Sequence, residues 1–257
     1  MSKELDIKIR KIIDEAIKLL NENNEYSNNY EKDHNDSNSI ICDHLIHNNE
    51  FDKDINKSGK KDINGGINKE INKKINKDIN KEIKEEIARV TSSVIPEQTG
   101  SFEKSTSPLL KYAESSTLHG SKETEPLLRL IREVFDYLPW KYNYEEREDK
   151  KDLGSYMGWA ELIGPEAPYK SDDFCLGFTL ISPYTLYPEH RHPAIELYKV
   201  LSGTAEWTLE GATSKRVPGE VILHPSNKIH KMQTYDQTLL ALYTWSGNDV
   251  VTLSEYV

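Results

Sequence analysis

A change in the character of the sequence near residue 153 most constrains the fold. Beyond it, short apolar runs alternate with glycine and proline at intervals of about ten residues. The runs are residues 174–181, 195–201, 205–209, 220–223 and 239–245. Each has the length of a strand and none shows helical periodicity, so the segment predicts a sandwich or barrel of antiparallel strands. We therefore expect a mainly β domain over residues 153–257.

Helices are expected before this domain. Within residues 1–20, apolar side chains recur at helical spacing, and Ser2 can serve as the N-cap. Two further helix starts are expected at Ser107 and Thr124, because each is a capping residue with proline one or two positions later. We expect residues 87–152 to form a helical region that packs on the β domain and takes no part in chemistry.

A polar segment, residues 21–86, lies between these helical parts. It holds 15 asparagines among 66 residues and lacks tryptophan and proline. Isoleucine recurs at every fourth residue from Ile63 to Ile87, and each such step turns a helix by about 40°. The row therefore spirals around the helix and cannot stay on one packing seam. We interpret the segment as a low-complexity insertion, disordered or a solvated helix, that contributes no core. An interaction tail is the less favoured interpretation.

Charge and composition exclude several classes of protein. The net charge of −10 argues against a nucleic-acid-binding surface, which needs a basic stripe. No run of about 18 apolar residues is present, so no membrane span is expected. The N-terminal sequence lacks the apolar region of a secretory signal, and the two cysteines, Cys42 and Cys175, form no CxxC pair. A cytoplasmic location is the resulting expectation.

Four residues have the spacing of metal ligands. His190 and His192 are two residues apart and share one side of a strand, and Glu196 can join them if that strand continues past a kink. His230 can add a third imidazole from another strand. Such a mixed nitrogen and oxygen site suits Zn, Fe(II), Mn, Ni or Co without selecting among them. His224 precedes a turn and is interpreted as structural.

The same residues resemble the two cupin motifs. The stretch His190-x-His192-x3-Glu196-x6-Gly203 is similar to the first motif, and Gly219-x5-Pro225-x-Asn227-x2-His230 to the second. The departures are Tyr184 and Asn227 in place of glycine and Thr234 in place of asparagine, and none removes a ligand. The resemblance implies a cupin double-stranded β-helix, which is a jelly-roll barrel, preceded here by N-terminal α-helices.

A narrower resemblance covers about residues 125–250. The string Trp159-Ala-Glu-Leu-Ile-Gly-Pro, the run from Tyr187 to Tyr198, and Ser202-Gly-Thr-Ala-Glu-Trp207 resemble the cupin dimethylsulfoniopropionate (DMSP) lyases, especially the DddL type. The resemblance implies a divalent metal in the barrel and cleavage of DMSP to dimethyl sulfide and acrylate. The implied partner is this small zwitterionic sulfonium, with no nucleic acid and no membrane. A homodimer is a further expectation.

The reaction assigns roles to aromatic residues. A β-elimination needs a base beside the metal, and Tyr198, two residues after Glu196, is the first candidate, with Tyr187 as the second. The resemblance leaves two alternatives for one ligand of the metal, which can be either His190 or Tyr198. A sulfonium is best received by aromatic rings. Tyr243 and Trp245 share a strand face, and Trp207 and Trp159 are further candidates.

Two other functions use the same ligands. An Fe(II) cupin dioxygenase or a metal isomerase acting on another small acid would need no other side chains at the metal. A metal-bearing cupin that only binds a ligand is the non-enzymatic alternative.

Overall fold

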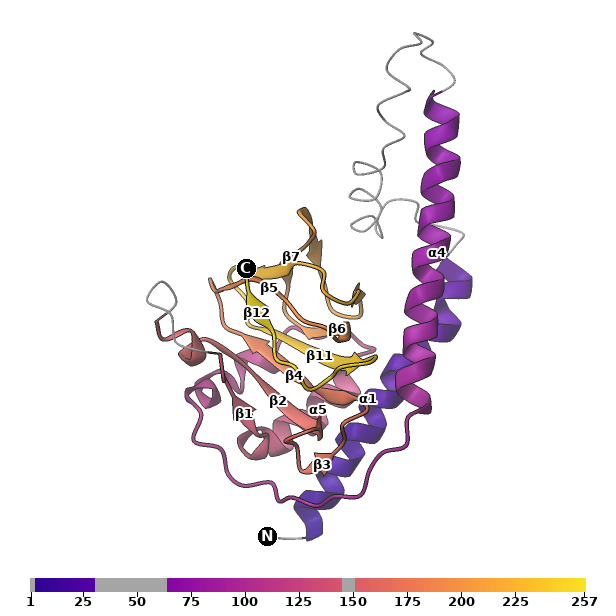
Figure 1. Cartoon of the computed structure of the whole chain (residues 1–257). Helices are drawn as coiled ribbons and strands as arrows, with labels where there is room; N and C mark the ends of the chain where they lie inside the picture. The colour runs from indigo at the N-terminus through magenta and orange to yellow at the C-terminus, as the bar shows by residue number, and fades with distance from the viewer. Residues whose placement is uncertain (1–2, 31–63, 145–150) are drawn as a thin grey trace.

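The computed structural model describes residues 3–30, 64–144 and 151–257, and for residues 23–30 and 64–76 it describes the backbone alone. Ser2 and residues 31–63 of the polar segment lie outside the described residues. Helices lie in the first part of the chain and most strands in the second (Figure 1). The prediction of a mainly β domain preceded by helices is confirmed.

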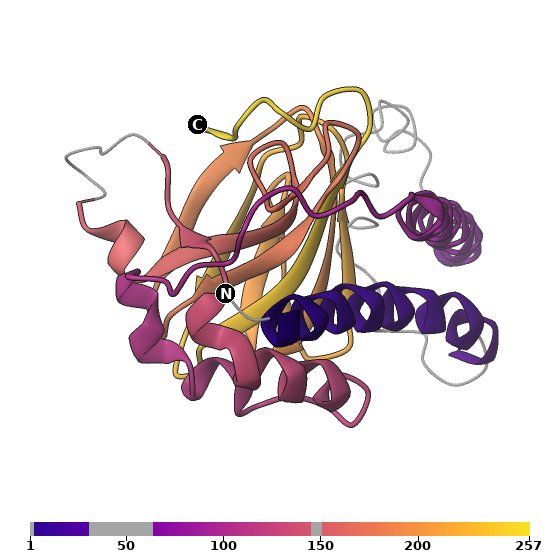
Figure 2. The ribbon, with the colours of Figure 1, turned by 90° about the horizontal axis from the view of Figure 1, so that it is seen from below.

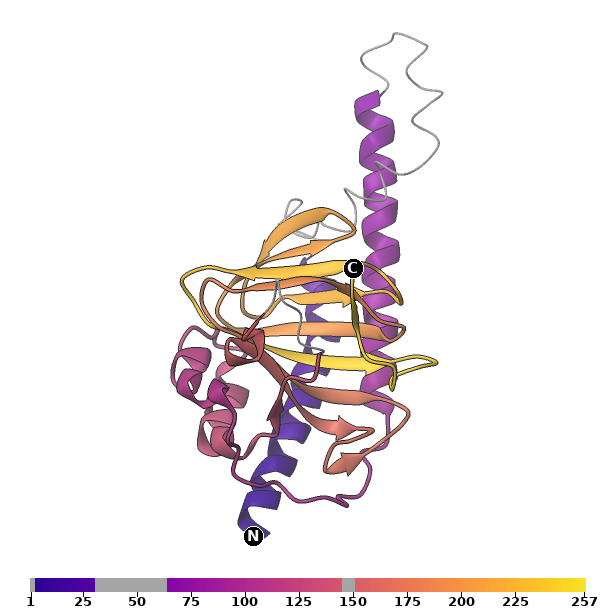
Figure 3. The same cartoon turned by 60° about the vertical axis from the view of Figure 1, so that its left-hand side comes forward.

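Two mainly antiparallel sheets form the β domain (Figure 3). The larger sheet has the order β1-β2-β4-β11-β6-β9, and β3 pairs with β2. Its strands are β1 Trp140–Lys141, β2 Met157–Gly164, β3 Tyr169–Lys170, β4 Cys175–Ile181, β6 Ile195–Ser202, β9 Val221–His224 and β11 Leu239–Ser246. The smaller sheet has the order β12-β5-β10-β7-β8. Its strands are β5 Leu186–Arg191, β7 Ala205–Leu209, β8 Ala212–Arg216, β10 His230–Thr234 and β12 Glu255–Tyr256.

The two sheets pack face to face around a core that both supply. Tyr187, Trp207 and Met232 come from the smaller sheet, and Val200 and Ala241 from the larger one, and all are buried in one cluster. Two departures from the cupin motifs agree with this arrangement. Tyr184 and Asn227 replace glycine and adopt the left-handed conformation that glycine favours, with φ of 55° and 61°.

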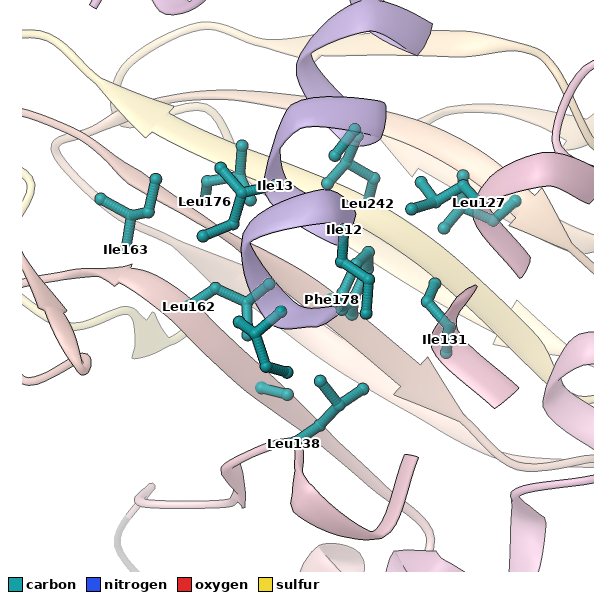
Figure 4. Packing of buried hydrophobic residues seen from close by; sticks show 14 of the residues in the cluster. Ile12, Ile13, Leu127, Ile131, Leu138, Leu162, Ile163, Leu176, Phe178 and Leu242 are labelled. Carbon is teal, nitrogen blue, oxygen red and sulfur yellow. The ribbon is translucent and has the colours of Figure 1, made fainter. Parts of the chain in front are cut away.

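Helices cover the outer face of the larger sheet (Figure 2). The predicted N-terminal helix is α1 Lys3–Tyr30, which runs beyond its expected end at residue 20. Its residues Ile12 and Ile13 pack with the inner side of α5 Glu125–Val134 and with the sheet residues Phe178 and Leu242 (Figure 4). The predicted start at Ser107 caps only a short 3₁₀ helix, Pro108–Tyr112, followed by another at Ser115–Thr117 and a third at Phe135–Tyr137. A last 3₁₀ turn, Leu153–Ser155, precedes β2.

The isoleucine repeat ends in a helix that packs. Helix α4 Asn64–Ser92 runs beside α1, and its N-terminal part projects beyond the β domain (Figure 1). Ile79 and Ile87 are buried and Ile83 is half-buried. Three successive members of the row span only about 80°, because each step turns by about 40°, so they share one face. The expectation that residues 21–86 contribute no core therefore does not hold at the end of the segment.

Candidate functional site

The inner face of the larger sheet presents its polar and aromatic side chains in rows. Residues that pair across antiparallel strands point to the same face. Glu196 on β6 is paired with Trp245 on β11 and with His224 on β9. In the next row, Tyr198 on β6 is paired with Tyr243 on β11. The alternation of the strands therefore brings residues that are far apart in sequence onto one surface.

The smaller sheet places the histidines opposite this surface. His190 on β5 lies directly across from His230 on β10, and their ring centres are 4.0 Å apart. His192 follows β5 by one residue, and its ring centre lies 5.1 Å from that of His230. All three rings are buried. The expectation that Glu196 shares one strand with His190 and His192 is wrong, because β5 ends at Arg191 and Glu196 lies on β6 of the larger sheet. The three rings still gather opposite Glu196, because the two sheets face each other.

Backbone carbonyls fix which nitrogen of each ring carries the hydrogen. The Nδ1 atoms of His190, His192 and His230 lie 2.7, 3.0 and 2.8 Å from the carbonyl oxygens of Pro188, Ala194 and Lys228. A carbonyl only accepts, so each Nδ1–H donates and each Nε2 keeps a free lone pair. This is the arrangement that a metal-binding histidine uses.

Two of these nitrogen atoms converge with a carboxylate oxygen of Glu196. The Nε2 atoms of His192 and His230 lie 3.0 and 3.5 Å from Glu196 Oε2, and the ligand atoms of the three residues all lie within 4.8 Å of one another. His230 Nε2 is buried and has no hydrogen-bond partner. Buried acceptors that face one another without a hydrogen between them are expected where a cation binds. The three residues therefore fit a divalent metal ion of the cupin type.

His190 stands beside this group. Burial, followed by the neighbouring His230, lowers the pKa of His190 well below its ordinary value, so the ring is neutral and able to ligate. It stacks on Tyr187, with ring centres 3.9 Å apart. Direct ligation by His190 stays a prediction.

Glu196 is held by a second layer of donors. Trp245 Nε1–H donates to Glu196 Oε1 over 2.8 Å. His224 Nδ1 lies 3.1 Å from Glu196 Oε2, while Trp207 Nε1–H donates to His224 Nε2 over 3.0 Å. Because tryptophan is only a donor, His224 must carry its hydrogen on Nδ1 and donate it to Glu196. Burial lowers the pKa of His224 to about 3, which keeps the ring neutral. His224 thus orients the carboxylate of Glu196, which agrees with its interpretation as a structural residue.

A cavity of about 260 Å³ lies against this centre. Five of the predicted aromatic residues line it, together with His190 and Glu196: Trp159, Tyr187, Tyr198, Tyr243 and Trp245. Trp207 does not line it, because its indole lies behind His224 and donates to that ring. The predicted role of Trp207 at the substrate is therefore replaced by a role in holding His224.

The two candidate bases differ in their surroundings. The Tyr198 hydroxyl lies 3.4 Å from Thr179 Oγ1, and burial, followed by the charge of Glu196, raises its pKa well above the ordinary value. The Tyr187 hydroxyl lies 2.6 Å from that of Tyr144. Burial and Tyr144 likewise raise the pKa of Tyr187. The hydroxyl of Tyr198 therefore makes the longer hydrogen bond of the two.

Sequence reasoning missed several residues of the cavity wall, among them Tyr144, Glu161 and Thr179. Glu161 could have been found, because it is two residues from Trp159 on β2 and so shares its face. Tyr144 lies outside any strand and carries no periodic signal. Its ring packs edge-on against Trp159, with centres 5.3 Å apart.

Comparison with known proteins identifies the family. The family model for dimethylsulfoniopropionate lyases matches residues 80–241, which is more than half of the chain. The chain belongs to the DMSP lyase family. The match includes the four predicted ligands and both candidate bases. None of the described helices is long and apolar enough to cross a membrane.

Two curated relatives carry this family's name. Dimethylsulfoniopropionate lyase DddQ of Ruegeria pomeroyi is 34% identical over 110 residues, which are 42% of this chain and 55% of the relative. The putative lyase DddL of Cereibacter sphaeroides is 32% identical over 122 residues, 47% of this chain and 51% of the relative. The chain thus spans about half the length of these relatives.

Solved structures of DMSP lyases share the fold. The crystal structure of DddQ from Ruegeria pomeroyi superposes with a TM-score of 0.57 at 26% identity, covering 64% of this chain and 82% of that one. A structure from work on RdDddP and RnDddQII gives 0.61 at 25% identity, covering 67% and 89%. The predicted cupin fold is confirmed.

Proposed function

We propose that this protein is a metal-dependent carbon–sulfur lyase that cleaves DMSP to dimethyl sulfide and acrylate by β-elimination. The observation that carries the proposal is the convergence of His192, Glu196 and His230 beside Tyr198 in an aromatic-walled cavity. The family match supports the substrate.

His192, Glu196 and His230, with His190 beside them, would hold the ion. Imidazole and carboxylate ligands suit Zn, Fe(II), Mn, Ni and Co, so the donor set does not select one metal. When bound, the ion would supply Lewis-acid stabilisation of the negative charge that develops on the substrate carboxylate. Trp245 and His224 keep both oxygens of Glu196 in place through their hydrogen bonds.

Tyr198 is proposed as the base. Its phenolate oxygen takes the proton from the carbon next to the carboxylate, the electron pair forms the double bond of acrylate, and the carbon–sulfur bond breaks with its electrons on sulfur. Burial keeps the phenol protonated by raising its pKa, so a nearby positive charge is needed to ionise it. The Thr179 hydroxyl, 3.4 Å away, can donate to the phenolate.

The aromatic wall is proposed to receive the sulfonium. Trp245 stacks on His192 with ring centres 4.4 Å apart, so its remaining face is available to the cavity that it lines. Tyr243 and Trp159 line the same space. A sulfonium has no hydrogen-bonding group, whereas the face of an aromatic ring attracts a cation.

Release of dimethyl sulfide tests the proposal. The purified protein is loaded in turn with Zn, Fe(II), Mn, Ni or Co and incubated with DMSP, and headspace gas chromatography measures dimethyl sulfide. We expect release that stops on chelation and is lost in His230→Ala. His119→Ala, a histidine outside the cavity, is the matched control and should keep activity. No release with any of the five metals contradicts the proposal, and oxygen consumption with a small acid would favour a dioxygenase.

The homodimer expected from the sequence stays a prediction. Light scattering coupled to size-exclusion chromatography would measure the mass in solution and test it directly.

A further inference from the structure

A carboxylate lies across the cavity wall from the candidate metal centre. Glu161 on β2 is paired with Gly177 on β4, Gly177 with Tyr243 on β11, and Tyr243 with Tyr198 on β6. These four positions form one row across the inner face of the sheet. Glu161 therefore stands three strands away from Tyr198, in the same cavity.

Gly177 connects the two ends of this row. A Cβ at Gly177 would lie 2.8 Å from Tyr243 Cε1, so only glycine leaves room for the tyrosine ring to lean across β4. The hydroxyl of Tyr243 reaches to 3.5 Å from Glu161 Oε2. The carboxylate is thus directed along the cavity wall beside an aromatic ring.

Glu161 has one long ion pair among the described residues. Its side chain is 13% exposed, and the nearest charged nitrogen, Lys141 Nζ, lies 3.9 Å from Oε1. Lys141 also lies 3.7 Å from Glu166, an exposed carboxylate at the rim. Burial raises the pKa of Glu161, and Lys141 opposes the shift only in part.

The two ends of the cavity therefore differ in charge. One end holds the metal-binding group, which would bind a carboxylate when loaded. The other end holds the carboxylates of Glu161 and Glu166 with only Lys141 to balance them, so it carries a net negative charge beside the rings of Trp159 and Tyr243. A molecule with a carboxylate at one end and a cation at the other matches both.

We propose that Glu161 is the counter-ion of the positively charged end of a zwitterionic substrate and determines the preference for such substrates over carboxylates that lack the cationic group. The proposal rests on the proposed function and names the residue that recognises the sulfonium charge. A desolvated carboxylate attracts a cation more strongly than aromatic faces alone, because little water screens the pair.

A purely structural role for Glu161 predicts a different result. Its side chain packs against the turn at Gly164, where a Cβ would lie 2.4 Å from the Glu161 carboxyl carbon. If this packing were its whole function, loss of the charge in Glu161→Gln would affect ligands with and without the cationic group equally.

Two ligands of the same shape separate these roles. They are 3-(trimethylammonio)propanoate and 4,4-dimethylpentanoate, which differ only in the replacement of the cationic nitrogen by carbon. Isothermal titration of the metal-loaded protein measures both dissociation constants without turnover. We expect the wild type to prefer the zwitterionic ligand. Glu161→Gln should weaken the zwitterionic ligand, which carries the ammonium, at least tenfold and the carboxylate without a cation less than twofold, with unchanged metal content.

Two further variants complete the test. Glu166→Gln, which removes a carboxylate paired with the same lysine, should change either constant less than twofold. Glu161→Asp keeps the charge and should retain part of the preference. An equal loss for both ligands in Glu161→Gln, or a wild type without preference for the cation, overturns the proposal. Absence of dimethyl sulfide release by the wild type would refute the lyase function instead, because the titration needs no catalysis.

Discussion

The two faces of strand β6 show how differently one segment can be used. Leu197 and Leu201 point outward and are buried under the helices, whereas Glu196 and Tyr198 point inward to the cavity. The outward residues need only the right shape and hydrophobicity. The inward residues need particular atoms at particular distances. A single strand therefore supplies both stability and chemistry, and its alternation keeps the two apart.

Lys199 is the exception on the outward face. Its side chain is fully buried, and its ammonium donates to Glu123 Oε1 over 2.6 Å and to the carbonyl of Gly219 over 3.1 Å. Burial lowers its pKa while Glu123 opposes the shift. Both partners of Lys199 lie outside the cavity, so this lysine stabilises the fold. The outward face of β6 therefore has a structural role even at its charged residue.

The largest expected effect is on the inner face. Tyr198→Phe removes the proposed base and should lower kcat for dimethyl sulfide release by about 10²–10⁴-fold, which is the usual contribution of a general base. Metal content and the free energy of unfolding should change little, because the ring stays in place. Full activity in this variant would show that another group takes the proton.

The adjacent residue should give the opposite result. Leu197→Ala leaves a cavity under the helices and should lower the free energy of unfolding by about 2–5 kcal/mol. Urea denaturation measures this loss. Below the unfolding transition, kcat and metal content should match the wild type. A changed kcat in the folded protein would mean that the two faces are coupled.

Trp207 on the inner face and Trp140 on the helix side allow the two faces to be compared through a hydrogen bond on each. Trp207→Phe removes the hydrogen-bond donor to His224 Nε2. The hydrogen of the His224 ring is then no longer fixed on Nδ1, and Glu196 loses the hydrogen bond that orients it. Loss of such a second-layer bond should weaken metal binding about 10–100-fold. Trp140→Phe removes a bond from an indole to the carbonyl of Phe135 on the helix side.

Competition with a chelator measures metal affinity in both variants. Trp140→Phe should keep the wild-type affinity and lose only about 1 kcal/mol of stability. Equal metal affinity in the two variants would mean that the Trp207 bond does not support the centre.

The sequence predicts the inner face well where it lies on regular strands. The alternation of Glu196 with Tyr198 and of Tyr243 with Trp245 depends only on strand geometry. The convergence of His190 and His192 with Glu196 also depends on the turn that carries the chain from one sheet to the other. Alternation gives the face of a residue but not its depth, which is why Trp207 shares the inner side yet lies behind His224. Tyr144 reaches the cavity from outside any strand, so no pattern marks it.

The outer layer was harder to predict at its edges. The stripe of α1 is regular, and Ile9, Ile12 and Ile13 are buried as expected. In α4 the drift of the four-residue repeat suggested a solvated helix. Three successive isoleucines still lie on one side of the helix, so they can be buried against a single neighbouring surface. The buried Glu86 bonds to Ser246, next to Trp245 on β11, which fixes the end of this helix. Such a contact between distant segments has no local signal.

The smallest expected effect concerns the second candidate base. In Tyr187→Phe the ring can still stack on His190, and only the bond to the Tyr144 hydroxyl is lost. Because that hydroxyl is already engaged, we expect kcat to fall less than tenfold, with metal content unchanged. The measurement is dimethyl sulfide release beside Tyr198→Phe under the same conditions. A loss as large as that of Tyr198→Phe would move the base from β6 to β5, and the chemistry of the inner face would then depend on the smaller sheet.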